Sequence, residues 1–116
     1  MIVIEKQKDV AKKAMIDWLA DEHELGKKPS KIECVNEFDL YDLHYYVFRF
    51  KKGILGDWLL GVVGGYEKDS NEHCGHVFSD MEKYDPKTAI DSCIKMVEKI
   101  RAYWIGQAKH FEKRKR

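Results

Sequence analysis

The chain has 116 residues, of which 44% are hydrophobic and 12% aromatic, and its formal net charge is +1 at pH 7. This size and composition exclude a disordered chain. They allow one domain whose hydrophobic core is large enough to be stable without a disulfide or a bound metal ion. The small net charge gives no general attraction to nucleic acid, and no apolar run approaches the ~20 residues that span a membrane. We therefore expect one domain over residues 1–116.

The cysteines and the N-terminus indicate a reducing compartment. Cys34, Cys74 and Cys93 form an odd set without disulfide-framework spacing, which argues against a secreted scaffold. The apolar start of the chain stops at Glu5 and is too short for a signal peptide. The expected location is the cytoplasm.

Residues 7–25 are expected to form the first helix, because apolar residues recur there with the spacing of one helix face. Gly26 suits a left-handed helix cap, and Pro29 follows shortly after it. Residues 1–5 fit either a short edge strand or a lead-in to this helix. The apolar face comprises Val10, Ala11, Ala14, Met15, Trp18 and Leu19.

A four-stranded antiparallel meander is expected next, with a polar loop before its last strand. The strands are expected over 31–38, 43–51, 57–66 and 76–81. In the third strand, Gly61, Gly64 and Gly65 predict a bulge or a close approach of two backbones.

The second and third strands are apolar on both faces. Tyr46, Phe48 and Phe50 point to one side of the second strand, and Tyr45 and Val47 to the other. An antiparallel sheet usually has one solvent-exposed face. Both faces of this sheet therefore need cover, from the helices, from a ligand or from a partner.

The last element is a long helix from about Lys87 to about His110, packed on the sheet. Asp85 is a good N-cap, and Pro86 a good first helical residue. A helix of about 24 residues spans roughly 36 Å, whereas a strand of about seven residues covers roughly 23 Å. The helix is therefore expected to extend beyond the sheet. Its stripe comprises Ile90, Cys93, Val97, Ile100, Trp104 and Phe111, with Gln107 as a polar interruption.

The far end of this helix supplies the candidate interface residues, Trp104, Ile105 and Phe111, which lack an expected partner within the chain. The tail over about 109–116 is basic. Its cations suit the negative end of the helix dipole, and an acidic body with a basic tail could also steer a partner.

One loop carries weak metal-ligand candidates, His73, Cys74 and His76. Imidazole and thiolate groups bind zinc, but this spacing matches no standard zinc signature and has no second half-site. No metal and no cofactor are therefore expected.

A set of aromatic and polar residues could line a small-molecule pocket between sheet and helices. These candidates are Tyr46, Phe48, Trp58, Phe78, His76 and Asp80. His76 and Asp80 share a face of an alternating strand, as an acid–base pair would, but no recognised catalytic signature accompanies them. No catalytic residue is assigned.

These observations favour a non-catalytic cytoplasmic binding protein that acts through a protein partner or through self-association. A small-molecule-binding domain or modest enzyme is the alternative. Nucleic acid is not an expected partner, because the strand cations Arg49, Lys51 and Lys52 lie beside acidic clusters. A membrane is not an expected partner either.

Overall fold

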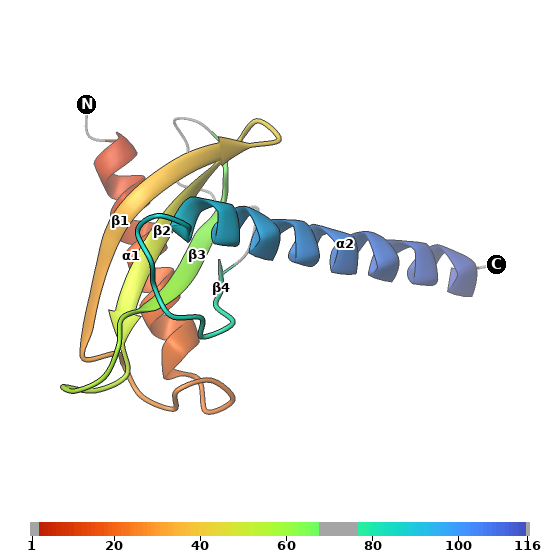
Figure 1. Ribbon diagram of the computed structural model, residues 1–116. Coiled ribbons are helices and arrows are strands. Elements are labelled where there is room, and N and C mark those ends of the chain that lie inside the picture. Colours follow the sequence, from red (N-terminus) through yellow and green to blue (C-terminus); the bar gives the residue numbers. More distant parts are fainter. Residues whose placement is uncertain (1–2, 68–76, 116) are drawn as a thin grey trace.

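The computed structural model describes the backbone of residues 3–67 and 77–115, and the side chains of residues 7–67 and 77–102 (Figure 1). Two helices and four strands make up this part of the chain. In order, they are α1 (Val3–Ala20), β1 (Lys31–Leu40), β2 (Leu43–Lys51), β3 (Leu59–Tyr66), β4 (Val77–Phe78) and α2 (Ala89–Lys115).

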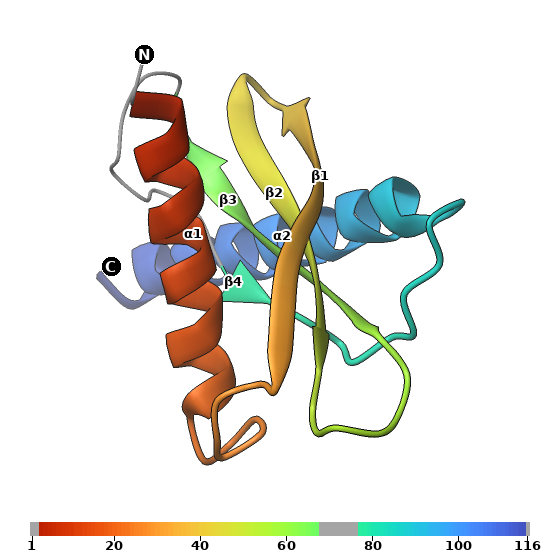
Figure 2. The same ribbon diagram turned by 90° about the vertical axis from the view of Figure 1, so that its left-hand side faces the viewer.

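The strands form one antiparallel sheet in the order β1-β2-β3-β4, which confirms the expected α+β meander. The two helices lie on opposite faces of this sheet (Figures 1 and 2). The sheet is therefore the middle of three layers, and helices supply the cover that both of its faces need.

The face toward α1 is a closed apolar core. Tyr46, Phe48 and Phe50 of β2 are fully buried there, as the alternation of the strand predicts. The core on this face comprises Ala11, Met15, Leu19, Tyr46, Phe48, Phe50, Val63 and Tyr66.

The face toward α2 holds a second core. Tyr45 and Val47 of β2 point to this side, again as predicted, and meet the first turns of α2. This core comprises Tyr45, Val47, Leu60, Val62, Ala89, Cys93, Met96 and Val97. The two-sided apolar character of β2 and β3 is thus explained by packing within the chain.

The glycines of β3 produce both features that the sequence predicts. The register of β2 against β3 shifts between His44 and Tyr45, where Gly65 has a φ of 89°. A Cβ atom on Gly64 would lie 2.7 Å from the Cα atom of Tyr45. Only glycine fits at that distance, because a backbone atom cannot move aside as a flexible side chain can.

Helix α1 differs from its expected bounds at both ends. It already includes Val3, so the lead-in alternative holds for the start of the chain, and it ends at Ala20 rather than at residue 25. The chain then turns, with the Leu25 amide donating to the Leu19 carbonyl at 3.0 Å. The Gly26 amide bonds to Asp21 at 2.9 Å, so the left-handed Gly26 closes this turn and not the helix itself.

Strand β4 is much shorter than the expected 76–81, and residue 76 is outside the described residues. The Ser79 hydroxyl donates to the Leu60 carbonyl at 2.5 Å and so replaces a ladder bond. Met81 then takes a φ of 62°. The chain then pairs with the start of β3 through one antiparallel bridge between Leu59 and Lys83, made by the Leu60 amide to the Glu82 carbonyl at 2.9 Å and the Tyr84 amide to the Trp58 carbonyl at 2.8 Å.

The expected N-cap, Asp85, caps the turn before α2 and not the helix itself, and Pro86 lies in that turn rather than at the first helical position. The Asp85 carboxylate accepts the Lys87 amide at 2.9 Å, and the helix begins at Ala89 after one turn. It continues to Lys115, beyond the expected end at His110. Its 27 residues are about 40 Å long at 1.5 Å per residue. Within the described ranges, no helix is both long and apolar enough to cross a membrane.

Candidate functional site

Helix α2 extends well past the sheet, as its length predicts. Its first turns cross the sheet, and the rest projects away from the molecule (Figure 1). We call residues 103–115 of this helix the α2 arm. Among the elements that the structure describes, no other helix or strand lies beside the arm (Figure 1).

In the sequence, the apolar stripe of α2 continues from the turns that cover the sheet into the arm, with Gln107 as a polar interruption. Cys93 and Val97 of this stripe are buried against the sheet. Seven residues beyond Val97 the same helix face carries Trp104, and seven further on Phe111. The side chains of Trp104, Ile105 and Phe111 lie outside the described residues, so their role as an interface stays a prediction.

A second candidate surface is the loop between β2 and β3, which we call the β2–β3 loop (residues 52–58). Ile54 is 88% exposed and Leu55 is 90% exposed. They are the most exposed large apolar side chains among the residues described. These two residues are not among the predicted site residues, although an apolar pair between Gly53 and Gly56 is visible in the sequence.

The base of the β2–β3 loop is held by hydrogen bonds from the segment before β1. The Ser30 amide donates to the Lys51 carbonyl at 3.0 Å. The Ser30 hydroxyl donates to the Gly53 carbonyl at 2.7 Å. The loop therefore leaves the sheet from a fixed base, with the apolar pair at its tip.

A cation–aromatic stack lies beside this base. The Arg49 guanidinium is 4.2 Å from the Trp58 ring centroid and 5.5 Å from that of Tyr84. Arg49 also pairs with Glu33 across the β1–β2 ladder, and the Lys51 ammonium lies 5.1 Å from the Trp58 ring. Trp58 is thus engaged by cations of its own chain.

The six candidate pocket residues are distributed over both sides of the sheet. Tyr46 and Phe48 are fully buried under α1, whereas Trp58 lies on the opposite face. The Phe78 ring is 6.2 Å from that of Trp18 at the β4 edge. His76 is outside the described residues.

Asp80 is exposed and borders a small depression beside α2, of about 170 Å³. Its lining mixes two acids with two lysines. The lining residues are Asp80, Glu82, Ser92, Lys95, Met96 and Lys99.

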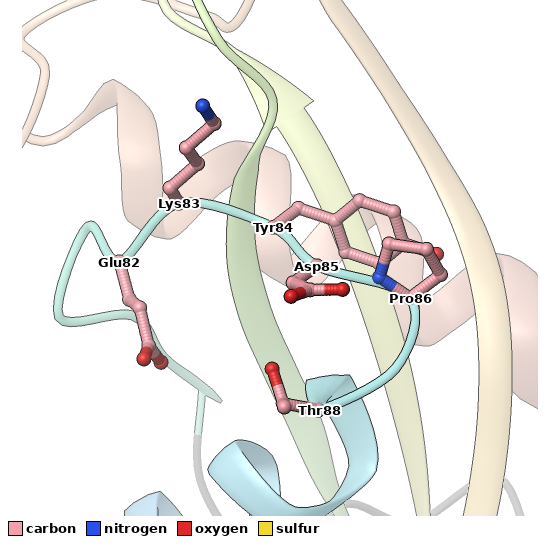
Figure 3. A pocket seen from close by; sticks show the side chains of 6 residues that line it. All are labelled: Glu82, Lys83, Tyr84, Asp85, Pro86 and Thr88. Atoms are coloured by element: carbon pink, nitrogen blue, oxygen red, sulfur yellow. The ribbon is translucent and has the colours of Figure 1, made fainter.

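A larger depression of about 470 Å³ lies along the segment that leads into α2 (Figure 3). Tyr84 and Pro86 supply its apolar part, and Glu82, Lys83 and Asp85 its charges. All of its lining residues come from one stretch of chain, residues 82–88. A concavity made by a single segment offers a shallow docking surface and not an enclosed pocket.

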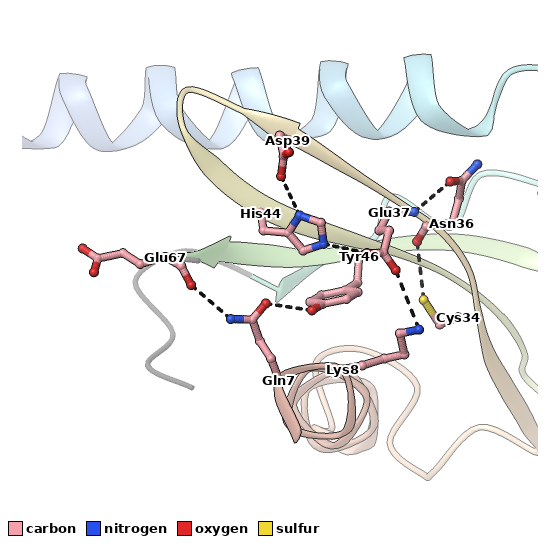
Figure 4. Close-up of polar contacts among 9 residues, drawn as sticks. All are labelled: Gln7, Lys8, Cys34, Asn36, Glu37, Asp39, His44, Tyr46 and Glu67. Atoms are coloured by element: carbon pink, nitrogen blue, oxygen red, sulfur yellow. Dashed lines mark hydrogen bonds and ion pairs between the residues drawn. The ribbon is translucent and has the colours of Figure 1, made fainter. Parts of the chain in front are cut away.

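A polar network closes the end of the sheet next to α1 (Figure 4). The Tyr46 hydroxyl donates to Gln7 Oε1 at 2.7 Å, and Gln7 Nε2 donates to the Glu67 carbonyl at 3.1 Å. Burial, reinforced by the charge of Glu37, raises the pKa of Tyr46 to about 12. The phenol therefore stays protonated and serves as a hydrogen-bond donor.

His44 is held between two carboxylates in the same region (Figure 4). Its Nδ1 atom is 2.5 Å from Asp39 Oδ1, and its Nε2 atom is 3.0 Å from Glu37 Oε1. Both ring nitrogens have a carboxylate partner in β1. His44 therefore links β2 to β1, and neither nitrogen is free to act as a general base.

The described thiols are also unsuited to chemistry. Burial raises the pKa of the Cys93 thiol to about 12 and raises that of Cys34. Both are therefore protonated and weakly nucleophilic near neutral pH. The described residues contain no group of three or more His, Cys, Asp or Glu placed to hold a metal ion. His73, Cys74 and His76 lie outside them.

Comparison with known proteins gives no family for this chain. No protein-family model matches it, and neither a curated protein nor a solved structure matches it.

Proposed function

We propose that this protein is a non-catalytic interaction module that binds a protein partner, or a second copy of itself, through the α2 arm. One observation carries the proposal. In the sequence, the apolar stripe of helix α2 continues after the helix has left the sheet that buries the first half of that stripe. A stripe of this kind is stabilised when another surface covers it.

The physical cost of an isolated arm supports this reading. Helices shorter than about 12–15 residues are marginal in water by themselves, and most helical stability comes from packing of an apolar face. Burying a Trp side chain removes about 150–250 Å² from water. A partner that covers Trp104 and Phe111 therefore stabilises both the complex and the helix.

Charge indicates which surface the partner presents. The arm region of the sequence is basic, with Glu112 as its acidic exception. The cations are Lys109, Lys113, Arg114, Lys115 and Arg116. An acidic groove or helix would complement them. The exposed acids around the end of α1 give a second copy such a surface, and they are Asp17, Asp21, Glu22 and Glu24.

A cytoplasmic location is part of this proposal. Cys34 and Cys93 are free thiols, which fits a reducing compartment. We do not propose a pocket enzyme as a second candidate. Tyr46 and Phe48 pack in a closed core, and the described titratable groups of the sheet end are engaged with one another.

Sedimentation velocity over a range of concentrations tests the self-association form of the proposal. The wild type is compared with the double variant Trp104→Glu/Phe111→Glu, which places charges in the stripe. Ala102→Glu is the matched control, because Ala102 is exposed on the same helix. If a second copy is the partner, the wild type and the control dimerise and the double variant stays monomeric. Dimers that persist in the double variant would contradict this form.

A further inference from the structure

We propose that the β2–β3 loop is an insertion site for an anionic lipid surface. This site is separate from the α2 arm. Figure 1 shows the loop and the arm at different ends of the molecule. The proposal rests on the exposure of the loop tip, the fixed base of the loop and the cations around it.

The tip of the loop is apolar, small and convex. Ile54 is 88% exposed and Leu55 is 90% exposed, whereas Val10, another exposed apolar residue of the described chain, is 40% exposed. Two adjacent aliphatic side chains with almost no contact to their own protein have apolar surface to remove from water.

Hydrogen bonds and an ion pair hold the two limbs of the loop at its base. Ser30 bonds to both Lys51 and Gly53. On the other limb, Lys83 lies 3.7 Å from Asp57 as an ion pair. Binding that needs little ordering of the loop loses less conformational entropy.

Lysines lie where the loop leaves the sheet, because Lys51 and Lys52 lead into it and Lys31 pairs with Lys51 in the β1–β2 ladder. The connection between α1 and β1 lies at the same end of the molecule as the β2–β3 loop (Figures 1 and 2). The lysines at this end are Lys27, Lys28, Lys31, Lys51 and Lys52. Two of the nearby acids are already paired, Asp57 with Lys83 and Glu33 with Arg49. Further acids, Asp21, Glu22 and Glu24, come directly after α1.

A lipid surface fits this arrangement better than a protein pocket does. Stable protein interfaces bury about 800 Å² on each partner and favour aromatic residues and Arg at their centre. The tip offers Ile54 and Leu55 alone. A bilayer needs no matching shape, and it combines insertion of apolar side chains with attraction of lysines to anionic headgroups.

Vesicle co-sedimentation tests the proposal with the full chain. The probes are phosphatidylcholine vesicles with and without about one-third phosphatidylserine, at low salt and at about 1 M salt, where charges are screened beyond about 3 Å. The wild type is expected to bind the anionic vesicles at low salt. Binding is expected to fall at least about tenfold without phosphatidylserine or at high salt.

Substitutions distinguish the contribution of the loop to vesicle binding from that of other basic regions. Ile54→Ser/Leu55→Ser is expected to weaken binding at least about tenfold, because the apolar contribution is lost. Lys51→Gln/Lys52→Gln is expected to weaken it about fivefold for each lysine removed. The matched controls on α1, Val10→Ser and Lys12→Gln/Lys13→Gln, are expected to bind like the wild type.

Two results would overturn the proposal. One is the absence of binding to anionic vesicles at low salt. The other is wild-type binding by the folded Ile54→Ser/Leu55→Ser variant, because the basic α2 arm would then account for the attraction. In either case the loop tip would be reassigned to a protein partner.

Discussion

The guanidinium of Arg101 lies 4.0 Å from the ring centroid of Tyr41, and this contact joins α2 to the tip of the β1–β2 hairpin. Tyr41 and Asp42 form the two-residue turn of that hairpin, with φ values of 54° and 62°. Arg101 comes two residues before the start of the α2 arm in the sequence. The hairpin thus braces the helix just before the α2 arm begins.

Removing this brace is expected to loosen the arm. Arg101→Ala should lower the free energy of unfolding by about 0.5–1 kcal/mol, the usual range of an exposed cation–π contact. Hydrogen exchange of the α2 amides should accelerate most in residues 101–115. Lys99→Ala, at an exposed position of the same helix, is the control and should leave that exchange unchanged. Equal exchange in the two variants would contradict the brace.

The glycines of β3 and of the β2–β3 loop should differ strongly in their tolerance of alanine. Gly64→Ala should cost about 3 kcal/mol, because the new methyl group meets the Tyr45 backbone. Gly61→Ala should cost about 1 kcal/mol, because it meets the flexible end of Met15 at 2.6 Å. Gly53→Ala has no atom within 4 Å of the new group and should stay within about 0.5 kcal/mol of the wild type. Urea denaturation measures the three values, and any other order would contradict the packing described.

Asp42 is expected to be a suboptimal turn residue. A residue other than glycine is strained at its φ of 62°, so Asp42→Gly should raise the free energy of unfolding by about 0.5 kcal/mol. Asp9→Gly, at an exposed site inside α1, should instead lower it by about 1 kcal/mol. Thermal unfolding of the two variants gives the comparison. A destabilised Asp42→Gly variant would show that its side chain has a role beyond the turn.

Alkaline pH is expected to destabilise the fold. Burial raises the pKa of Cys93 from 9.0 to about 12, and that of Tyr66 from 10.0 to about 12. As pH rises above 9, the unfolded chain loses these protons before the folded one does. Their contribution to stability is therefore complete below pH 9 and is lost as pH rises toward 12.

The expected loss is up to about 1.4 kcal/mol per pH unit for each such group. Free energies of unfolding at a series of pH values above 8 measure it. Cys93→Ala removes one titrating group and should flatten the fall between pH 9 and 10. An unchanged slope in that variant would mean that the Cys93 thiol ionises as readily in the folded protein as in the unfolded one.

The alternating pattern of β2 predicted which of its side chains lie on the same face of the sheet, because every second side chain of a strand points to the same side. Tyr46 and Tyr45 therefore went to the correct sides. The bond from the Lys87 amide to Asp85 was also predictable, because capping depends on residues close in sequence, but it closes a turn and α2 begins only at Ala89. The end of α1 was not, because the bond from Leu25 to Leu19 replaces the helical pattern over a short turn.

The contacts of the candidate sites depend on register and exposure, which the sequence does not display. His44 lies opposite Asp39 in the β1–β2 ladder, and only that pairing brings the carboxylate to the ring. Ile54 and Leu55 occur in a segment that reads as an ordinary glycine turn. Their exposure follows from how far the loop projects beyond the sheet.

The most direct test of the central claim is quantitative capture from a lysate of the source cells, with tagged wild type, Trp104→Glu/Phe111→Glu and Ala102→Glu compared side by side. The account predicts one protein, or an untagged copy of this chain, retained at near-equal stoichiometry by the wild type and by Ala102→Glu and lost with the double variant. Equal retention by all three proteins would contradict the claim that the α2 arm is the interface. So would the absence of any stoichiometric partner on the wild type.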